Sequence, residues 1–330
     1  MRRTALFTPL VLAVFTAFLV VAPPGVSADG ELTARIEAID DGGIAATTVV
    51  TVLGPDGRPV VGAEDGDFVL TDDGEPAAVF SVTRAEDASV GIAVVLAIDT
   101  SLSMEQVIGA ARIGAGGAVS GLGPEDQAAI VAFSRSVDTL QPLTGDAAAL
   151  DAALGSLFAF GPTALYDAVL AAIEVARDAP LDRRVVILLT DGFDEGSSAT
   201  QTEALAAAAA NGVPIYAIAF GANTDEDFLR EIAATSDGSF LLAPDAEAML
   251  TAYEEFASVL RSQYVIEFAP GPATTEAERV LEVTVTSAGV IDTASRSYTS
   301  SRPLLTGAAT GAERAPAHYR RAGCPAPRRG

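Results

Sequence analysis

The chain has 330 residues, of which 44 are acidic and 20 are basic, and its formal net charge at pH 7 is −24. Between Asp29 and Ser300 the imbalance is larger, with 43 acidic residues against 12 Arg and a formal charge of −31. This charge argues against nucleic acid as a partner and against anionic membrane surfaces, because both would be repelled. The length is sufficient for one large domain and a smaller one.

The single His and the single Cys, His318 and Cys324, both lie in the last 30 residues. One Cys excludes an internal disulfide, so stability must come mainly from the core. A Ser-His-Asp or Cys-His arrangement in the folded body is excluded as well, since it needs a His beside the nucleophile. The sequence therefore favours a binding protein over an enzyme with an activated nucleophile.

The first 28 residues have the pattern of an export signal. A positive end at Arg2 and Arg3 precedes the uncharged, mainly apolar residues 5–22, and helix breakers and small residues lead to Ala28. We expect cleavage after Ala28. An uncleaved anchor is the alternative, since a helix over this apolar stretch would reach about 27 Å, nearly the hydrocarbon thickness. In both cases we expect the protein to be secreted or held at the cell envelope, with membrane contact only through an uncleaved anchor.

Residues 29–88 predict strands rather than helices. Residues 47–53 are rich in β-branched side chains, and residues 68–71 and 78–82 flank an Asp- and Gly-containing turn, as in a hairpin. The acidic residues of this turn indicate a solvated loop rather than a calcium site. The segment is too short for a comfortable core of its own.

Residues 89–262 alternate strand and helix patterns. This alternation predicts an α/β fold in which a doubly wound, mostly parallel sheet is flanked by helices. The expected strands are 92–98, 128–133, 137–140, 184–190, 214–219 and 239–242. The expected helices are 104–120, 146–157, 163–177, 199–211, 225–235 and 246–262.

Two further strand patterns, at 263–268 and 280–285, follow the α/β segment. We expect the segment 263–300 to complete a small β-sandwich with residues 29–88, so that the α/β domain is inserted between the two halves. Residues 301–330 contain six Arg and one Glu among Pro, Gly and Ala, which predicts a disordered basic tail.

The first buried strand of the α/β segment, at 92–98, is followed at once by Asp99, Ser101 and Ser103. Ligands bind at the carboxyl ends of the strands in an open α/β sheet, and a cluster of oxygens suits a hard divalent cation. Alone, this short pattern is more often an ordinary helix cap.

Two later oxygen-bearing side chains belong to the same edge of the predicted sheet. Thr163 follows a Gly-Pro turn at the start of a helix, and Asp191 follows the buried strand 184–190. Each has an ordinary explanation, as a helix cap or as part of an Asp-Gly turn. The combination with Asp99, Ser101 and Ser103 favours a metal site instead.

With these residues in this order, the chain closely resembles the von Willebrand factor type A family over about residues 90–262. The family's metal-ion-dependent adhesion site has the form Asp-x-Ser-x-Ser, then a Thr, then an Asp. The resemblance implies that Ser101, Ser103 and Thr163 bind the cation directly, whereas Asp99 and Asp191 hold coordinated waters or bind it themselves. Mg²⁺ is the expected ion, with Mn²⁺ or Ca²⁺ as alternatives. Leu102 stands where many bacterial members have Gly, at a position where the family varies.

The hairpin pattern that begins at Asp67 also resembles a segment that precedes the domain in bacterial secreted proteins related to this family. A site with few charged ligands leaves Mg²⁺ with an affinity for one more anionic ligand, which a partner's carboxylate can supply. The resemblance therefore implies an exported adhesion or envelope-assembly protein that captures an Asp or Glu of a protein partner. The alternatives are a structural or secretion-assembly component with a purely structural ion, and a metal-dependent hydrolase, which the lack of a general base disfavours.

Overall fold

The structure is a computed structural model that describes residues 31–41, 45–55, 57–88, 90–271 and 278–300. The predicted export signal at 1–28 and the predicted basic tail at 301–330 lie outside these residues. None of the helices in the described ranges combines the length and the apolar character needed to cross a membrane.

A six-stranded sheet in the order β11-β10-β9-β6-β7-β8 forms the centre of the larger unit. Neighbouring strands pair in parallel except β7 and β8, which are antiparallel. The strands are β6 (Ile92–Asp99), β7 (Gln127–Phe133), β8 (Val137–Thr144), β9 (Arg183–Thr190), β10 (Ile215–Phe220) and β11 (Ser239–Ala243). The predicted α/β fold with a mostly parallel sheet is confirmed.

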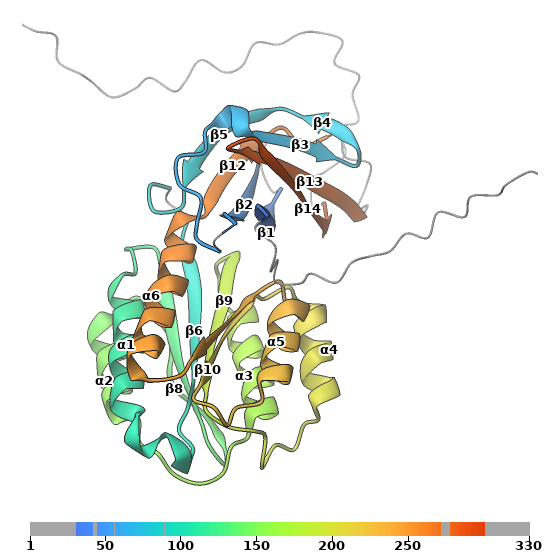
Figure 1. The fold of residues 1–330 in the computed structure, drawn as a ribbon. Helices are drawn as coiled ribbons and strands as arrows, with labels where there is room; N and C mark the ends of the chain where they lie inside the picture. The colour runs from blue at the N-terminus through green and yellow to red at the C-terminus, as the bar shows by residue number, and fades with distance from the viewer. Residues whose placement is uncertain (1–30, 42–44, 56, 89, 272–277, 301–330) are drawn as a thin grey trace, which may run out of the picture.

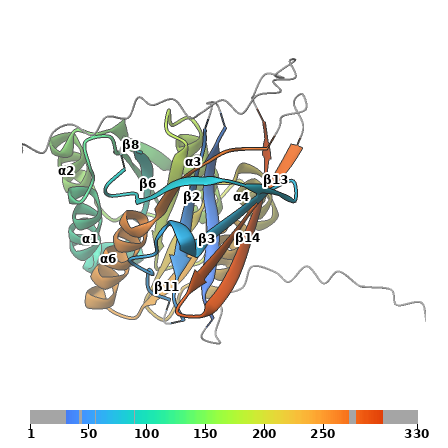
Figure 2. The ribbon, with the colours of Figure 1, turned by 90° about the horizontal axis from the view of Figure 1, so that it is seen from above.

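Helices cover both faces of this sheet (Figure 1). One face packs against α1 (Ile108–Ser120), α2 (Ala147–Ser156) and α6 (Ala246–Ser262). The other packs against α3 (Leu165–Arg177), α4 (Gln201–Asn211) and α5 (Glu226–Thr235). Seen from above, α1, α2 and α6 lie together on one side of the molecule (Figure 2). This cover explains why every residue of β6 is buried and why its first seven residues are all apolar.

The local boundaries differ from the expected ones at the carboxyl end of β6. The chain first forms a short 3₁₀ helix at Leu102–Gln106, and α1 begins only at Ile108, whereas the sequence predicts one helix over 104–120. Strand β8 runs to Thr144, four residues beyond its expected end, because it pairs with β7 through two irregularities in the register.

Two four-stranded sheets form a β-sandwich from the segments on either side of the α/β unit. The first has the order β1-β2-β12-β5, with β1 (Thr33–Asp40), β2 (Ala46–Leu53), β5 (Val79–Arg84) and β12 (Tyr264–Phe268). The second has the order β14-β13-β3-β4, with β3 (Phe68–Asp72), β4 (Glu75–Ala77), β13 (Glu278–Ser287) and β14 (Val290–Thr299). Both sheets contain strands from before and after the α/β unit, and side chains of both share one core.

The expected hairpin between residues 68–71 and 78–82 is wrong. Strand β3 turns into the three-residue β4 instead, with Leu70 opposite Ala77. The chain then crosses to the other sheet, where β5 pairs with β12. After the crossing, Val79 and Val82 pack against the core that the two sheets share.

A buried polar chain joins the sandwich to the α/β unit at the end of α6, where α6 leads directly into β12 (Figure 1). Arg183, at the start of β9, donates hydrogen bonds from Nε and Nη2 to Oε1 of Gln263 at 3.2 and 2.6 Å. Gln263 Nε2 donates to Thr51 Oγ1 at 3.0 Å, and Thr51 donates to Glu37 Oε1 at 2.6 Å. Strands β1, β2 and β9 are therefore connected through side chains that are largely hidden from water.

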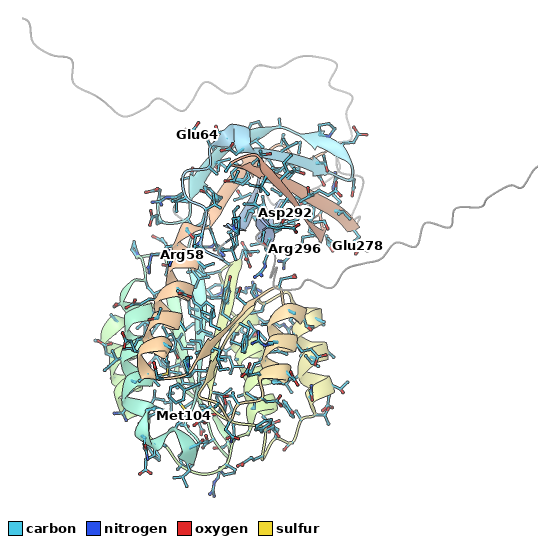
Figure 3. All side chains as sticks on the ribbon, in the orientation of Figure 1. Arg58, Glu64, Met104, Glu278, Asp292 and Arg296 are labelled. Carbon is cyan, nitrogen blue, oxygen red and sulfur yellow. The ribbon has the colours of Figure 1, made fainter. Side chains whose placement is uncertain are left out.

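Arg296 adds a second connection at the same junction (Figure 3). Its Nη1 donates to the carbonyl oxygens of Ile36 and Glu37 at 2.7 and 2.9 Å, and its Nη2 donates to that of Gly212 at 3.2 Å. Strand β14 is thus attached both to β1 and to the loop after α4. The sandwich covers the amino-terminal ends of β6 and β9 and leaves their carboxyl ends open.

Candidate metal centre

Strands β6 and β9 are neighbours in the sheet, and their register places Ile98 opposite Leu189. Asp99 at the end of β6 therefore lies beside Thr190 at the end of β9, and Asp191 follows one residue later. After β6 the chain continues into β7, which pairs with one edge of β6, whereas β9, which comes later in the sequence, pairs with the other edge. Such a reversal of strand order is where open α/β sheets place their ligands.

Asp99 is fully buried, and both of its carboxylate oxygens are hydrogen-bonded. The backbone N–H of Ser101 donates to Oδ1 at 2.7 Å, and the hydroxyl of Thr190 donates to Oδ2 at 2.6 Å. Thr190 Oγ1 also accepts from the backbone N–H of Gly192 at 3.2 Å. Asp99 thus fixes the positions of two loops, the one that follows β6 and the one that follows β9.

The two serines and Asp191 form a continuous row of oxygens. Ser101 Oγ and Ser103 Oγ are 3.0 Å apart, and Ser103 Oγ donates to Asp191 Oδ1 at 2.7 Å. Ser101 is buried, Ser103 is exposed, and Asp191 is half-buried, so the row runs from the sheet toward the surface. Four of the five predicted ligands are therefore linked by hydrogen bonds.

Thr163 reaches the same place from the loop before α3. The N–H of Ala164 donates to the carbonyl of Ser134 at 2.7 Å, and the carbonyl of Thr163 accepts from the N–H of Glu195 at 2.8 Å. A Cβ added at Gly192 would lie 3.4 Å from Thr163 Oγ1. The hydroxyl of Thr163 consequently lies against the turn that follows Asp191, and the structure brings all five predicted residues to one edge.

Burial raises the pKa of Asp99 from 3.8 to about 6, although the hydrogen bonds from Thr190 and Ser101 act in the opposite direction. Burial also raises the pKa of Asp191, and the hydrogen bond from Ser103 lowers it in part. Neither carboxylate forms an ion pair with an Arg of the described ranges. A cation between them would offset the cost of keeping two charged groups out of water.

The donor set fits a hard divalent cation. It consists of three hydroxyls and two carboxylates, all oxygens, and magnesium prefers oxygen ligands and retains some of its waters. Within the described ranges no three His, Cys, Asp or Glu side chains gather as a metal site, so an ion here would depend on the hydroxyls. Ser101, Ser103 and Thr163 would hold the ion directly, with Asp99 and Asp191 balancing its charge.

Two residues important for this arrangement are not among the predicted ligands. Thr190 hydrogen-bonds to Asp99, and its position as the last residue of a strand next to Asp191 is the only sequence signal for it. Asp194 Oδ1 accepts from the backbone N–H groups of Leu165 and Tyr166 at 2.8 and 3.3 Å, which positions the first turn of α3 and hence Thr163. Nothing in the sequence pairs Asp194 with this turn.

The raised pKa of Asp99 predicts that divalent cations bind more weakly in acid. Below pH 6 a proton occupies Asp99 and competes with the ion, so Mn²⁺ affinity should be about tenfold lower at pH 5 than at pH 7. The raised pKa of Asp191 acts in the same direction. Calorimetric titration at pH 5, 6 and 7 measures this, with circular dichroism verifying the fold at each pH. Equal affinity at pH 5 and pH 7 would contradict the assignment of Asp99.

Comparison with known proteins identifies the larger unit. Residues 93–255 match the family model of the von Willebrand factor type A domain. Among curated proteins, none matches the chain. A solved von Willebrand factor type A protein from Catenulispora acidiphila is similar in fold, with a TM-score of 0.50 and 17% identity over 81% of this chain and 72% of that one.

Two other solved structures resemble the chain less completely. Proximal thread matrix protein 1 from the mussel byssus, solved with a zinc-occupied MIDAS motif, has a TM-score of 0.48 and 21% identity, covering 57% of this chain and 49% of that one. The domain of the pilus tip protein Mfa5 from Porphyromonas gingivalis has a TM-score of 0.45 and 11% identity, covering 52% and 96%. The α/β unit of this chain therefore matches the model of the von Willebrand factor type A domain over residues 93–255 and has the fold of that domain.

Proposed function

We propose that this protein binds a protein partner through a divalent cation held by Asp99, Ser101, Ser103, Thr163 and Asp191. The ion accepts one carboxylate from an Asp or Glu of the partner. Domains of this family are generally interaction modules rather than enzymes. The first 28 residues support an exported protein that acts in adhesion or assembly at the cell envelope.

The observation that carries the proposal is the hydrogen-bonded row from Asp99 through the two serines to Asp191, which ends at the surface. Met104, directly after Ser103, lies at the end of the α/β unit that faces away from the sandwich (Figure 3). A partner can therefore approach the row without displacing the sandwich.

The composition of the site favours a partner over a purely structural ion. Three neutral hydroxyls and two carboxylates leave a divalent ion with unsatisfied attraction for an anion, whereas a cage of carboxylates would cancel it. The acidic body repels acidic partners at long range, so a carboxylate would be retained mainly by the short contact with the ion.

The test is capture of envelope proteins on the immobilised full chain, with added Mg²⁺ and with EDTA, using the wild type and Asp191→Ala. Asp151→Ala is a matched control, since Asp151 is an exposed carboxylate on α2. We expect the same partners to be retained by wild type and Asp151→Ala in Mg²⁺, and to be lost in EDTA and with Asp191→Ala. Equal retention in all conditions would reject the proposal and leave the ion a structural role.

A further inference from the structure

Large apolar side chains are exposed on the same loops that carry the candidate ligands. Leu102, between the two serines, is 61% exposed. Phe158, in the loop before Thr163, is 64% exposed, and Phe193, two residues after Asp191, is 49% exposed. Single exposed apolar residues are common on protein surfaces, but three of this size around one site indicate a binding surface.

Backbone contacts hold two of these loops side by side. The N–H of Leu102 donates to the carbonyl of Gly161 at 2.9 Å, and the N–H of Phe160 donates to the carbonyl of Thr100 at 2.7 Å. The rings of Phe158 and Phe160 stack with centroids 5.0 Å apart and planes at 22°. The ring of Phe158 therefore packs on a second ring, which restricts its position although Phe158 is exposed.

The third loop joins the same surface through the candidate ligands. Ser103, directly after Leu102, donates to Asp191, and Phe193 follows Asp191 in the same turn. Hydrogen bonds from Leu102 and Ser103 thus connect their loop to the loop of Phe158 and to the loop of Phe193. We call Leu102, Phe158 and Phe193 the apolar rim.

A positively charged side chain, that of Arg135, lies next to the loop of Phe158 in the apolar rim. Arg135 is exposed in the loop between β7 and β8, and a Cβ added at Gly161 would lie 3.3 Å from its Nε. No carboxylate of the described ranges forms an ion pair with Arg135. In a body with a charge of −31, a positively charged side chain that forms no ion pair within the described ranges complements an acidic partner.

We propose that the metal-binding edge recognises a protein segment in which the metal-bound Asp or Glu has aromatic or aliphatic neighbours. These neighbours pack on the apolar rim, and Arg135 contacts a carboxylate of the same segment. The inference rests on the proposed function and adds the chemistry of the partner. Apolar contacts supply affinity here, and the ion with Arg135 supplies selectivity for acidic segments.

The test uses three fluorescent peptides with acetylated and amidated ends and the full chain in Mn²⁺. The peptides are Gly-Phe-Glu-Leu-Gly, Gly-Ser-Glu-Ser-Gly and Gly-Phe-Gln-Leu-Gly, and fluorescence polarisation measures their binding. We expect the first to bind about tenfold more tightly than the second, because it buries apolar side chains. We expect the third not to bind, since an amide is a poor substitute for the carboxylate, and EDTA to abolish binding of the first.

Variants separate the apolar rim from the metal site. The double variant Leu102→Ser with Phe158→Ser should remove the difference between the first two peptides while Mn²⁺ affinity, measured by calorimetry, stays unchanged. Ile291→Ser is the control, since Ile291 is 64% exposed on β14 of the sandwich. Arg135 is tested with a fourth blocked peptide, Gly-Phe-Glu-Leu-Asp-Gly, whose Asp supplies a second carboxylate. Arg135→Gln should weaken binding of this peptide about twofold to fivefold, as expected for an exposed ion pair, and should leave the two Glu peptides with a single carboxylate unchanged.

The outcomes distinguish this inference from the proposed function. Equal, Mn²⁺-dependent binding of the two Glu peptides would overturn the inference and leave the proposed function in place. The same holds if the double variant binds like the Ile291→Ser control. Binding of the Gln peptide as strong as that of its Glu counterpart, unaffected by EDTA, would overturn both.

Discussion

Replacement of Thr163 by Val is expected to abolish Mg²⁺ and Mn²⁺ binding while the α/β unit remains folded. The substitution keeps the volume and β-branching of a buried side chain and removes the one oxygen that the loop before α3 contributes. Loss of a direct oxygen ligand should lower affinity by on the order of a hundredfold or more, because outer-shell changes alone cost about 10- to 100-fold. Isothermal titration calorimetry with both ions measures the loss.

Ser136→Ala is the matched control for this experiment. Ser136 carries a hydroxyl on the loop between β7 and β8 at the same edge, but its Oγ donates to Asp138 Oδ2 at 3.1 Å and is not part of the row of oxygens. The Mg²⁺ and Mn²⁺ affinities of the Ser136→Ala variant should equal those of the wild type. Undiminished affinity in Thr163→Val, with the fold verified by circular dichroism, would show that Thr163 is not a ligand.

Replacement of Arg183 by Met is expected to lower the free energy of unfolding by about 3 kcal/mol, because several buried acceptors lose their donor together. Besides Gln263, the guanidinium of Arg183 binds the carbonyl oxygens of Val90 and Leu260, each at 2.9 Å. The side chain is 4% exposed, so water cannot replace these hydrogen bonds without entering the junction. Urea denaturation followed by circular dichroism measures the change.

The neighbouring Arg184 supplies the control. It lies on the same strand and donates one hydrogen bond from Nε to the carbonyl of Leu181 at 2.6 Å in a partly buried position. Arg184→Met should therefore cost less than about 1 kcal/mol. Similar losses for the two variants would mean that the chain from Arg183 to Glu37 contributes little to the junction between the sandwich and the α/β unit.

The α/β fold could be predicted from the sequence because the inner strands of its sheet are buried on both faces. β6 contains seven consecutive apolar residues, 92–98, and β9 contains five, 185–189, and each run is followed by oxygen-bearing residues. A strand that is buried on both faces needs apolar residues at consecutive positions, and this requirement does not depend on which strands lie beside it. The five candidate ligands follow from the same logic, with the family resemblance selecting them from other caps and turns.

The strand pairing of the sandwich was beyond what sequence could predict. β14 places only Ala294 and Tyr298 partly against the core, and polar residues dominate the rest of the strand, so its pattern is weak. The path of β5 depends on a crossing between sheets that is stabilised by contacts with β12, nearly two hundred residues later. Local patterns do not contain such long-range contacts.

The sequence by itself determined the α/β class, the apolar strands and the identity of the oxygen-bearing residues, because these depend on composition and short-range order. Only the tertiary structure decided which other residues lie beside the oxygen-bearing residues and which side chains around them are exposed. The register of β6 against β9 brings Thr190 to Asp99, and loop packing exposes Phe158 beside Leu102. Neighbours across a sheet and side-chain exposure are properties of packed elements, so they arise only when the whole chain has folded.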